Sequence, residues 1–342
     1  MATATAALEV GAIPYAKGLI DNQFRYYVRA DGMIWHSAES LPTSARMLTV
    51  LALHHSYSGD DGSFTLKYFS KAKALAELLM SRHAASLRMY DSNDPRYGIP
   101  PGDNYDGLQL QQPPATMTQP PSHWYSCAAE LYRACLEMGE VWTEVGKRQG
   151  RADVEAHGVA LLQLAPQVYQ HLHASLNATV RNSCWPALAT APRSPSDAQP
   201  AEATGSFRGY SQLLYSGALR PSQVSDIYQR FSTNSCGARL LVLGSPTSAA
   251  NGAVLSSGDA YGLGYGLLQH DQIEPFLLHF FSMSAHGYNR GSFTAPSSSN
   301  IADRDVPAVT YSAVAEVIAP TYLKWMLCFE EPETRTLWLA KA

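Results

Sequence analysis

The sequence predicts an all-α protein, a ring of paired antiparallel helices, and three observations lead to this prediction. Apolar residues recur at helical spacing along most of the 342 residues. The predicted helices are joined alternately by short turns and by long polar loops. No motif recurs at the period of about 34 to 47 residues that is typical of helical repeat arrays. In a ring of helix pairs, this alternation places the long loops on one rim, where functional residues usually lie.

Five helices are predicted in the first half of the chain. Ser63 and Ser122 are suitable N-caps for the third and fourth helix, and Gly150 ends the fourth. The polar, proline-rich segment 88–121 between them is too long for a simple connector. The five predicted helices span residues 15–28, 42–58, 63–87, 122–148 and 153–179.

Residues 186–205 are rich in Ala, Pro and Ser and predict a disordered insertion in a single domain that spans residues 1–342. The region 237–258 is expected to be extended, with a short strand at 239–243 and little strand elsewhere. Pro320 is expected to kink the last helix. The helices predicted after the insertion span residues 210–219, 221–232, 260–269, 271–285 and 310–329.

Composition favours a surface of aromatic and hydroxyl groups. Charged residues make up 16% of the chain, below the quarter typical of soluble domains, whereas it has 19 tyrosines and 6 tryptophans. This mixture suits sugars better than phosphates. The net charge of −4 gives no electrostatic basis for binding DNA or RNA, so no nucleic-acid partner is expected.

No apolar run approaches the roughly 18 residues of a membrane span, and the N-terminus lacks the pattern of a secretory signal. We therefore expect no membrane partner, while the compartment stays open. The cysteines are odd in number and lack CxxC spacing, which predicts buried free thiols and no metal or cofactor. They are Cys127, Cys135, Cys184, Cys236 and Cys328.

Three stretches resemble the (α/α)6 toroids of the six-hairpin glycosidase superfamily. They run from Gly98 to Asp106, from Tyr261 to Asp271 and from Leu277 to Ala295. The end of the chain, from Trp325 on, resembles the exit from such a toroid into a C-terminal β-domain. The resemblance covers nearly the whole chain and implies an (α/α)6-type toroid and a carbohydrate ligand. It implies no single activity, because the superfamily includes hydrolases, phosphorylases, lyases and proteins of unassigned function.

Assigning alternate helices to an outer and an inner ring makes the first helix, 15–28, an outer one without an inner partner. This predicts an incomplete toroid with about five of its six hairpins, and hence a fragment. A ring of fewer hairpins that is complete as it stands is the alternative. The oligomeric state stays open.

Glycoside cleavage needs two carboxyl groups about 5 to 9.5 Å apart, on either side of the scissile bond. The long loops before the predicted inner helices supply them, and we select Asp103 and Asp106 together with Glu39 as catalytic candidates. Turn formation is the competing interpretation for the two aspartates, since Asp beside Gly is common in turns. The other acidic residues of these loops are Asp259, Asp303 and Asp305.

Aromatic and polar residues on the same loops predict the substrate-binding surface, because sugar faces stack on rings while hydroxyls need polar partners. Trp124 and Tyr125 have a competing interpretation as core residues. The predicted binding residues are Trp35, His36, Trp124, Tyr125, His286, Tyr288 and Arg290.

The sequence thus predicts a glycoside hydrolase-like protein that acts on an oligo- or polysaccharide. The resemblance implies an acidic residue after Thr294-Ala-Pro296, where Ser297 stands here, which favours a non-catalytic glycan-binding remnant as the alternative. A metalloenzyme toroid of the lanthionine-cyclase or prenyltransferase kind would need a Cys/His zinc set, and no cysteine has a histidine at suitable spacing. Gly262-x-Gly264-x-Gly266 lacks a preceding strand and is interpreted as close helix packing.

Overall fold

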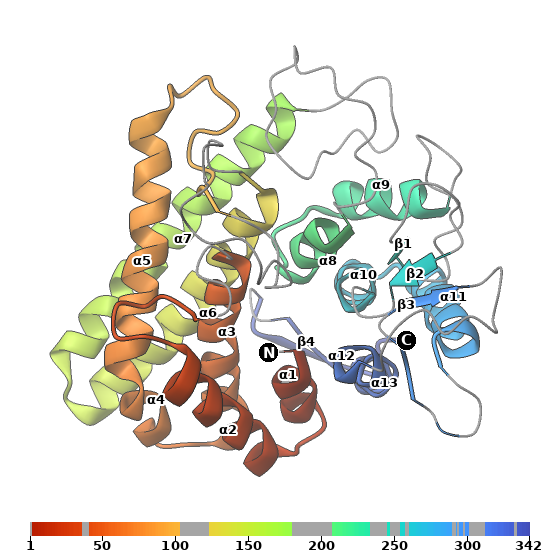
Figure 1. Ribbon diagram of the computed structural model, residues 1–342, viewed down its shortest axis with the longest axis horizontal. Helices are drawn as coiled ribbons and strands as arrows, with labels where there is room; N and C mark the ends of the chain where they lie inside the picture. Colours follow the sequence, from red (N-terminus) through yellow and green to blue (C-terminus); the bar gives the residue numbers. More distant parts are fainter. Residues whose placement is uncertain are drawn as a thin grey trace. The chain divides into compact units, whose positions relative to one another are not determined.

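The computed structural model contains two compact units, each described by itself (Figure 1). Unit 1 consists mainly of Thr3–Ala178 and unit 2 mainly of Pro195–Ala342. The structure describes residues 2–35, 41–102, 123–179, 207–232, 245–246, 254–256, 260–288, 292, 294–296, 298–300, 312–331 and 334–342.

Unit 1 is helical throughout its regular elements, as predicted. Its helices are α1 (Ala2–Glu9), α2 (Ile13–Asn22), the π-helical turn η1 (Gln23–Tyr27), α3 (Leu41–Ser58), α4 (Ser63–Lys67), α5 (Phe69–Met89), α6 (Tyr125–Gln149) and α7 (Ala152–Ala178).

Two features of these helices differ from the prediction. Helix α1 was not expected, because its Ala- and Thr-rich sequence shows no polar face, and residues 4–8 are all buried. It precedes α2, so the helix predicted at 15–28 is not the first helix of the chain. The predicted helix 63–87 is divided at Tyr68, whose backbone leaves the helical region (φ −106°, ψ 6°). The Tyr68 ring stacks on Phe24 with their centroids 5.1 Å apart, which anchors the break.

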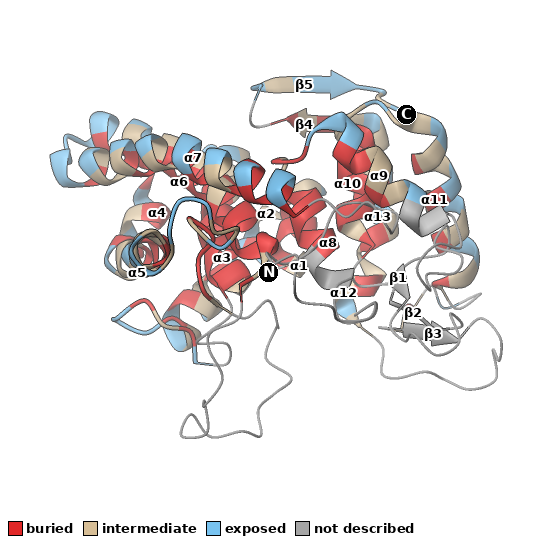
Figure 2. Cartoon of the chain, turned by 90° about the horizontal axis from the view of Figure 1, so that it is seen from above, coloured by how far each residue is buried: buried red, intermediate tan, exposed pale blue. Residues whose placement is uncertain are grey.

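Helices α3 and α6 run parallel. Arg46 pairs with Glu130 near the start of both helices. At their far ends, Arg148 in the last turn of α6 donates to the carbonyl of Asp60, two residues after α3 (3.2 Å). Most residues of α3 and α6 are buried, whereas most of α5 and α7 are not (Figure 2). The predicted division into inner and outer helices is therefore confirmed for unit 1.

Helix α5 runs antiparallel to α6. Phe69 at its start lies against Trp142, near the end of α6, with ring centroids 5.3 Å apart. Tyr90, just after its end, bonds His123, just before the start of α6. The inner helices α3 and α6 thus begin at the end of unit 1 where α5 finishes, and we call this the long-loop end.

Unit 2 also consists mainly of helices. They are α8 (Phe207–Tyr215), α9 (Pro221–Ser232), α10 (Tyr261–Gln269), α11 (Ile273–His286), α12 (Ala313–Glu316) and α13 (Ile318–Leu327). The pairs α8/α9 and α10/α11 are joined by short turns, as predicted. Helices α8 and α10 run parallel, because Ser211 meets Gly262 while the Gly217 carbonyl accepts from Gln269 further along (3.2 Å).

The glycines of α10 allow this close approach. A Cβ added to Gly262 would stand 1.9 Å from the Ser211 carbonyl oxygen, and one added to Gly264 would stand 2.2 Å from the Tyr322 ring. The interpretation of this motif as close helix packing is confirmed.

Two small antiparallel sheets complete the described part of unit 2. The first has the order β1-β2-β3, with strands Ser245–Pro246, Val254–Ser256 and Ser298–Asn300. Strands β1 and β2 fall within the predicted extended region, while residues 239–243 and the insertion 186–205 lie outside the described residues. The second sheet is a hairpin of β4 (Cys328–Glu331) and β5 (Thr336–Leu339). It lies outside the region where the sequence predicts strand, but the described part of the chain outside that region has little strand, as expected.

The predicted helix 310–329 is broken rather than kinked. Helix α12 ends at Glu316, and α13 begins at Ile318 because Pro320 offers no N–H to the Glu316 carbonyl and its ring crowds that group. The Tyr288 hydroxyl stabilises the break: it donates to the Ala315 carbonyl (2.8 Å) and accepts from the Ala319 N–H (3.0 Å).

Cys127 and Cys135 are buried thiols outside any disulfide of the described residues, as predicted, and burial raises the pKa of Cys135 to about 12. Cys328 is free and partly exposed. Cys184 and Cys236 lie outside the described residues. Within the described ranges, no helix combines the length and the apolarity that crossing a bilayer would require.

Candidate functional site

A long segment of the chain connects α5 to α6. The residues just before and just after its undescribed part, up to 102 and from 123, lie close together at the long-loop end of unit 1. Pro101 and His123 form an isolated antiparallel bridge, so the chain leaves and re-enters this end at adjacent points. The Gly102 carbonyl accepts a weak hydrogen bond from the thiol of Cys127 (3.7 Å), in the first turn of α6. The described chain on both sides of 103–122 is thus fixed against the start of an inner helix.

A neutral histidine holds the loop that leads into this bridge. The His123 Nδ1 lies 3.0 Å from the Ile99 carbonyl, so Nδ1 carries the proton and donates it. Its Nε2 then accepts from the Tyr90 hydroxyl at 2.9 Å. Burial lowers the pKa of His123, which keeps the ring in the neutral form that this arrangement needs.

A pair of histidines supports the same loop from α5 and α7. The His83 Nε2 lies 3.2 Å from the His171 Nδ1, and the Tyr97 ring meets His171 edge-on at 5.3 Å. Burial, with a smaller contribution from His171, lowers the pKa of His83 to about 4. Burial also lowers the pKa of His171. The two rings are therefore neutral at physiological pH and share one hydrogen bond.

Arg96 is exposed and Tyr90 partly exposed at this end. The Arg96 guanidinium lies 4.3 Å from the centroid of the Tyr90 ring. It also binds both carboxylate oxygens of Asp94 (2.7 and 2.9 Å), which holds the pKa of Asp94 below its usual value. The guanidinium is thus fixed by Asp94 and stacks on one face of the Tyr90 ring.

The structure separates the two predicted tryptophans. Trp124 is the N-cap residue of α6, and its buried indole N–H finds no hydrogen-bond partner among the described residues. Trp35 is 68% exposed and carries the Arg29 guanidinium 5.6 Å from its ring. Its neighbour Gly32 packs on Ala74, in the second turn of α5, so Trp35 lies well apart from the long-loop end.

Tyr125 belongs to the core of unit 1, the alternative that the sequence left open. It is fully buried, and its hydroxyl donates to the Ser175 carbonyl (3.1 Å) and accepts from the Ser175 hydroxyl (3.0 Å).

His286 and Tyr288 belong to unit 2. His286 is the last residue of α11 and is partly buried. The Tyr288 hydroxyl forms hydrogen bonds with the backbone of Ala315 and Ala319, on either side of the break between α12 and α13. The other predicted site residues, Glu39, Asp103, Asp106, His36 and Arg290, lie outside the described residues.

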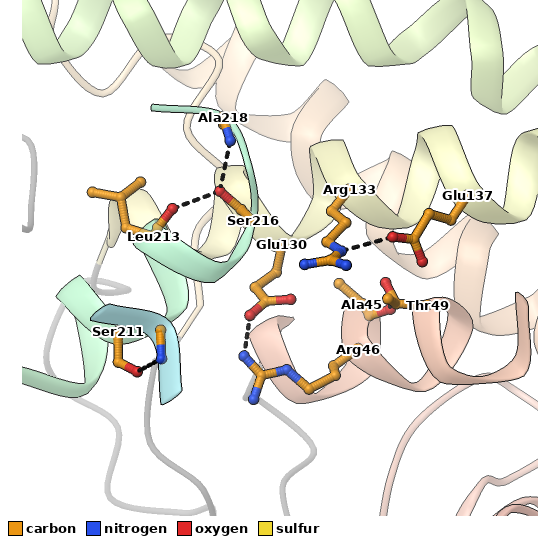
Figure 3. A network of polar contacts seen from close by, with 11 residues as sticks. Ala45, Arg46, Thr49, Glu130, Arg133, Glu137, Ser211, Leu213, Ser216 and Ala218 are labelled. Atoms are coloured by element: carbon orange, nitrogen blue, oxygen red, sulfur yellow. Dashed lines mark hydrogen bonds and ion pairs between the residues drawn. The ribbon is translucent and has the colours of Figure 1, made fainter. Parts of the chain in front are cut away.

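Buried charges lie between the inner helices of unit 1 (Figure 3). The Arg46 guanidinium on α3 donates to Oε1 of Glu130 on α6, and Glu130 is fully buried. On the same face of α6, Arg133 donates to Oε1 of Glu137 at 2.7 Å. Burial raises the pKa of Glu137, and the Arg133 charge opposes this.

Sequence reasoning missed these charges and the histidine pair. The available signal was a charged residue on the apolar face of a predicted helix, such as Arg46 before Met47-Leu48 and Glu130 after Ala128-Ala129. Periodicity assigns a residue to a face but does not identify its partner on another helix. In the part of the chain that the structure describes, no group of three or more His, Cys, Asp or Glu is arranged to hold a metal ion.

Comparison with known proteins gives structural similarity alone. No protein-family model and no curated protein matches the sequence. Two solved structures, both named as glycosidase variants, are similar in fold, with TM-scores of 0.55 and 0.53. Each is 12% identical in sequence, and the match covers 94% of this chain and 86% of the other. At this identity the likeness shows the fold: an all-α, toroid-type fold of the kind found in a glycosidase.

Proposed function

We propose that the protein is a glycoside hydrolase-like enzyme that binds an oligo- or polysaccharide at the long-loop end of unit 1. The observation that carries the proposal is the Pro101–His123 bridge. It fixes both ends of the segment that contains Asp103 and Asp106 at the N-terminus of an inner helix. In a ring of helix pairs, this is the rim to which the long loops contribute functional groups.

The described residues at this end have the chemistry that sugars require. The Arg96 guanidinium, which lies over one face of the Tyr90 ring, offers hydrogen-bond donors next to an aromatic side chain. The Trp124 indole N–H adds a donor whose partner is not among the described residues. Carbohydrate sites combine such faces with a few fixed polar groups. The glycosidase-type fold supports the same assignment.

The proposed reaction is acid–base hydrolysis by a pair of carboxyl groups. One carboxyl group protonates the glycosidic oxygen, and a carboxylate takes a proton from the attacking water. Asp103 is our first candidate for the acid, because it directly follows Gly102, whose carbonyl is bonded to α6. Asp106 and Glu39 are the other candidates from the sequence.

The test compares Asp103→Asn, Asp106→Asn and Glu39→Gln on a panel of aryl glycosides, with saccharide binding measured in parallel. Loss of the general acid should lower kcat by about 10²- to 10⁴-fold while binding is retained. Asp153→Asn is the matched control, since this exposed aspartate pairs with Arg151 at the opposite end of the helices. It should leave turnover unchanged.

The alternative is a glycan-binding protein without catalysis, which is favoured by the serine at position 297. It would be supported if the unmutated chain bound saccharides but cleaved none of the panel. The absence of both turnover and binding would overturn the proposed function.

A further inference from the structure

An exposed tryptophan follows a short hairpin in unit 1. Val28 and Ile34 form an isolated antiparallel bridge, and the Trp35 N–H donates to the Tyr27 carbonyl (3.1 Å). Val28 and Ile34 are buried, whereas Trp35 is 68% exposed. The backbone of the hairpin therefore fixes where the indole lies, while most of the residue stays open to solvent. Tryptophan is enriched at surfaces where proteins contact a partner or a ligand.

A fixed ion pair lies beside the indole. The Arg29 guanidinium is 5.6 Å from the centroid of the Trp35 ring, and its Nη2 lies 2.9 Å from Oδ2 of Asp31. Oδ1 of Asp31 accepts from the Met33 N–H (3.0 Å), so the turn holds the carboxylate and the carboxylate holds the guanidinium. Both charged side chains are half exposed. A ring beside such donors and acceptors matches a sugar, which has an apolar C–H face and hydroxyl groups around it.

A similar arrangement occurs at the start of the same segment. Tyr26, in the π-helical turn η1, is 62% exposed, and the Arg25 guanidinium lies 5.9 Å from its ring centroid. Nη2 of Arg25 is 3.7 Å from Oδ2 of Asp21. π-Helical turns are rare and often occur at functional sites. Residues 21–35 thus present two exposed rings, each with an arginine that is paired to an aspartate.

Charge and size favour a neutral saccharide over a macromolecular partner. Arg29 and Asp31 neutralise each other, so the ion pair beside Trp35 adds no net charge that would attract a polyanion. A tryptophan buries at most about 250 Å², so Trp35 at 68% exposure has about 170 Å² left to bury. A stable protein interface buries about 800 Å² on each partner. The surface around Trp35 therefore has the size of a contact with a few sugar units.

The hairpin is placed by α5 and not by the start of α6. Gly32, in its turn, packs on Ala74 in the second turn of α5. The long-loop end lies where α5 finishes at Met89, about 22 Å further along the helix axis. The hairpin therefore belongs to a different part of unit 1 from Tyr90 and Arg96.

We propose that Trp35, with Arg29 and Asp31 beside it, is a second saccharide-binding site, separate from the site of hydrolysis. This inference rests on the function proposed above. The site binds a neutral polysaccharide through a few of its sugar units, and it holds the protein on that chain while hydrolysis takes place at the long-loop end. A short aryl glycoside needs the long-loop end alone.

The binding experiment compares Trp35→Ala with Tyr15→Ala, a change at a tyrosine of α2 that is 61% exposed and lies outside residues 21–35. Retardation in native gels that contain starch, xylan or hydroxyethyl cellulose measures the affinity. On the polysaccharide that the unmutated chain binds best, Trp35→Ala should bind at least about 10-fold more weakly. Arg29→Met should bind about 3- to 10-fold more weakly. Tyr15→Ala should match the unmutated chain.

A comparison of two substrates separates this role from catalysis. The ratio of kcat/KM on the polysaccharide to kcat/KM on the best aryl glycoside should fall at least about 10-fold in Trp35→Ala, through a higher KM for the polysaccharide. Trp35→Phe keeps an aromatic ring and should recover part of the affinity. Circular dichroism and thermal unfolding verify that these variants keep the fold.

Four results would overturn the inference. Equal polysaccharide affinity in Trp35→Ala and Tyr15→Ala would reject Trp35 as a ligand contact and leave the proposed function standing. Equal losses on polysaccharide and aryl glycoside would place Trp35 in the site of hydrolysis. A lower molar mass of Trp35→Ala in light scattering would assign the surface to a contact between protein chains. Absence of saccharide binding by the unmutated chain would reject this inference together with the proposed function.

Discussion

The imidazole of His171 fills the space beside Gly98, where an added Cβ would stand 2.3 Å from the ring carbon Cγ. Gly98 also has a φ of +75°, a conformation that residues with a Cβ rarely adopt. The loop that leads to the Pro101–His123 bridge therefore depends on glycine for both its backbone conformation and its packing on α7.

We expect Gly98→Ala to lower the free energy of unfolding by about 2 to 4 kcal/mol, because it combines the positive φ with a clash. Gly59→Ala is the control: Gly59 has a φ of +62° but no atom within 4 Å of the added Cβ. It should cost only about 1 to 2 kcal/mol. Urea unfolding measures both, and equal losses would contradict the role assigned to His171.

The neutral histidines predict a stability that falls in acid. His83 has a folded pKa of about 4, against about 6.5 in the unfolded chain. Above pH 6.5 both states are neutral and the pair adds no pH dependence. Between pH 6.5 and 4 only the unfolded chain binds the proton, so the free energy of unfolding decreases, by about 3 kcal/mol in total from His83. Below pH 4 both states are protonated and this contribution stops changing.

His83→Gln tests this by removing the titrating group while leaving a donor for the His171 Nδ1. Unfolding in urea at pH 7 and pH 5 should show a smaller acid-induced loss in the variant than in the unmutated chain. The same loss in both would show that His83 is not the origin of the pH dependence.

Tyr288 was predicted to belong to the substrate-binding surface. Its hydroxyl, which bonds the backbone between α12 and α13, should also stabilise the fold. Tyr288→Phe leaves the backbone groups of Ala315 and Ala319 without this partner and should cost about 1 to 3 kcal/mol of unfolding free energy. Tyr15→Phe, at a tyrosine that is 61% exposed, should change it by less than about 0.5 kcal/mol. If thermal unfolding of Tyr288→Phe matched that of Tyr15→Phe, the hydroxyl would have no such role.

Arg46 and Glu130 should show strong energetic coupling. Removing one partner of a buried ion pair costs about 3 to 5 kcal/mol, since the other charge is left buried without its counter-charge. Arg46→Met and Glu130→Leu should each have this effect, and the double variant should lose clearly less than their sum. A double-mutant cycle in urea measures the coupling, and additive losses would show that the two side chains stabilise the fold independently.

The sequence predicted the helical hairpins of unit 1 because their turns carry strong signals. Gly150 ends α6 with a φ of +64°, and Gly62 begins α4 with a φ of +96°, the conformations that glycine favours. Helix α1 was missed because alanine-rich segments lack the polar face that marks an amphipathic helix. The β4–β5 hairpin was missed because the apolar run at 326–329 continues the helical pattern of α13 without a visible boundary.

The site was less predictable, for a physical reason. Loop composition selected the segment around Asp103 and the boundary residue Trp124 as candidates, since long polar loops with Asp, Gly and aromatic residues stand out in a helical chain, and Asp103 lies outside the described residues. Three residues lie inside helices: His83, His171 and Glu130. From a single sequence, the hydrophobic pattern indicates which face of a helix is buried, but not which residue of another helix packs against that face. Only the packing of α5 on α7 and of α3 on α6 brings these side chains to their partners.

The bridge between Pro101 and His123 has an evolutionary consequence. It fastens the two ends of residues 102–122 to each other, independently of what lies between them. The entropy of closing a loop rises only with the logarithm of its length, by about 0.6 kcal/mol for each doubling. Insertions and deletions in this segment are thus inexpensive, and the helices below need not change to accommodate them. The length of this segment can therefore change while the Pro101–His123 bridge and the start of α6 stay as they are.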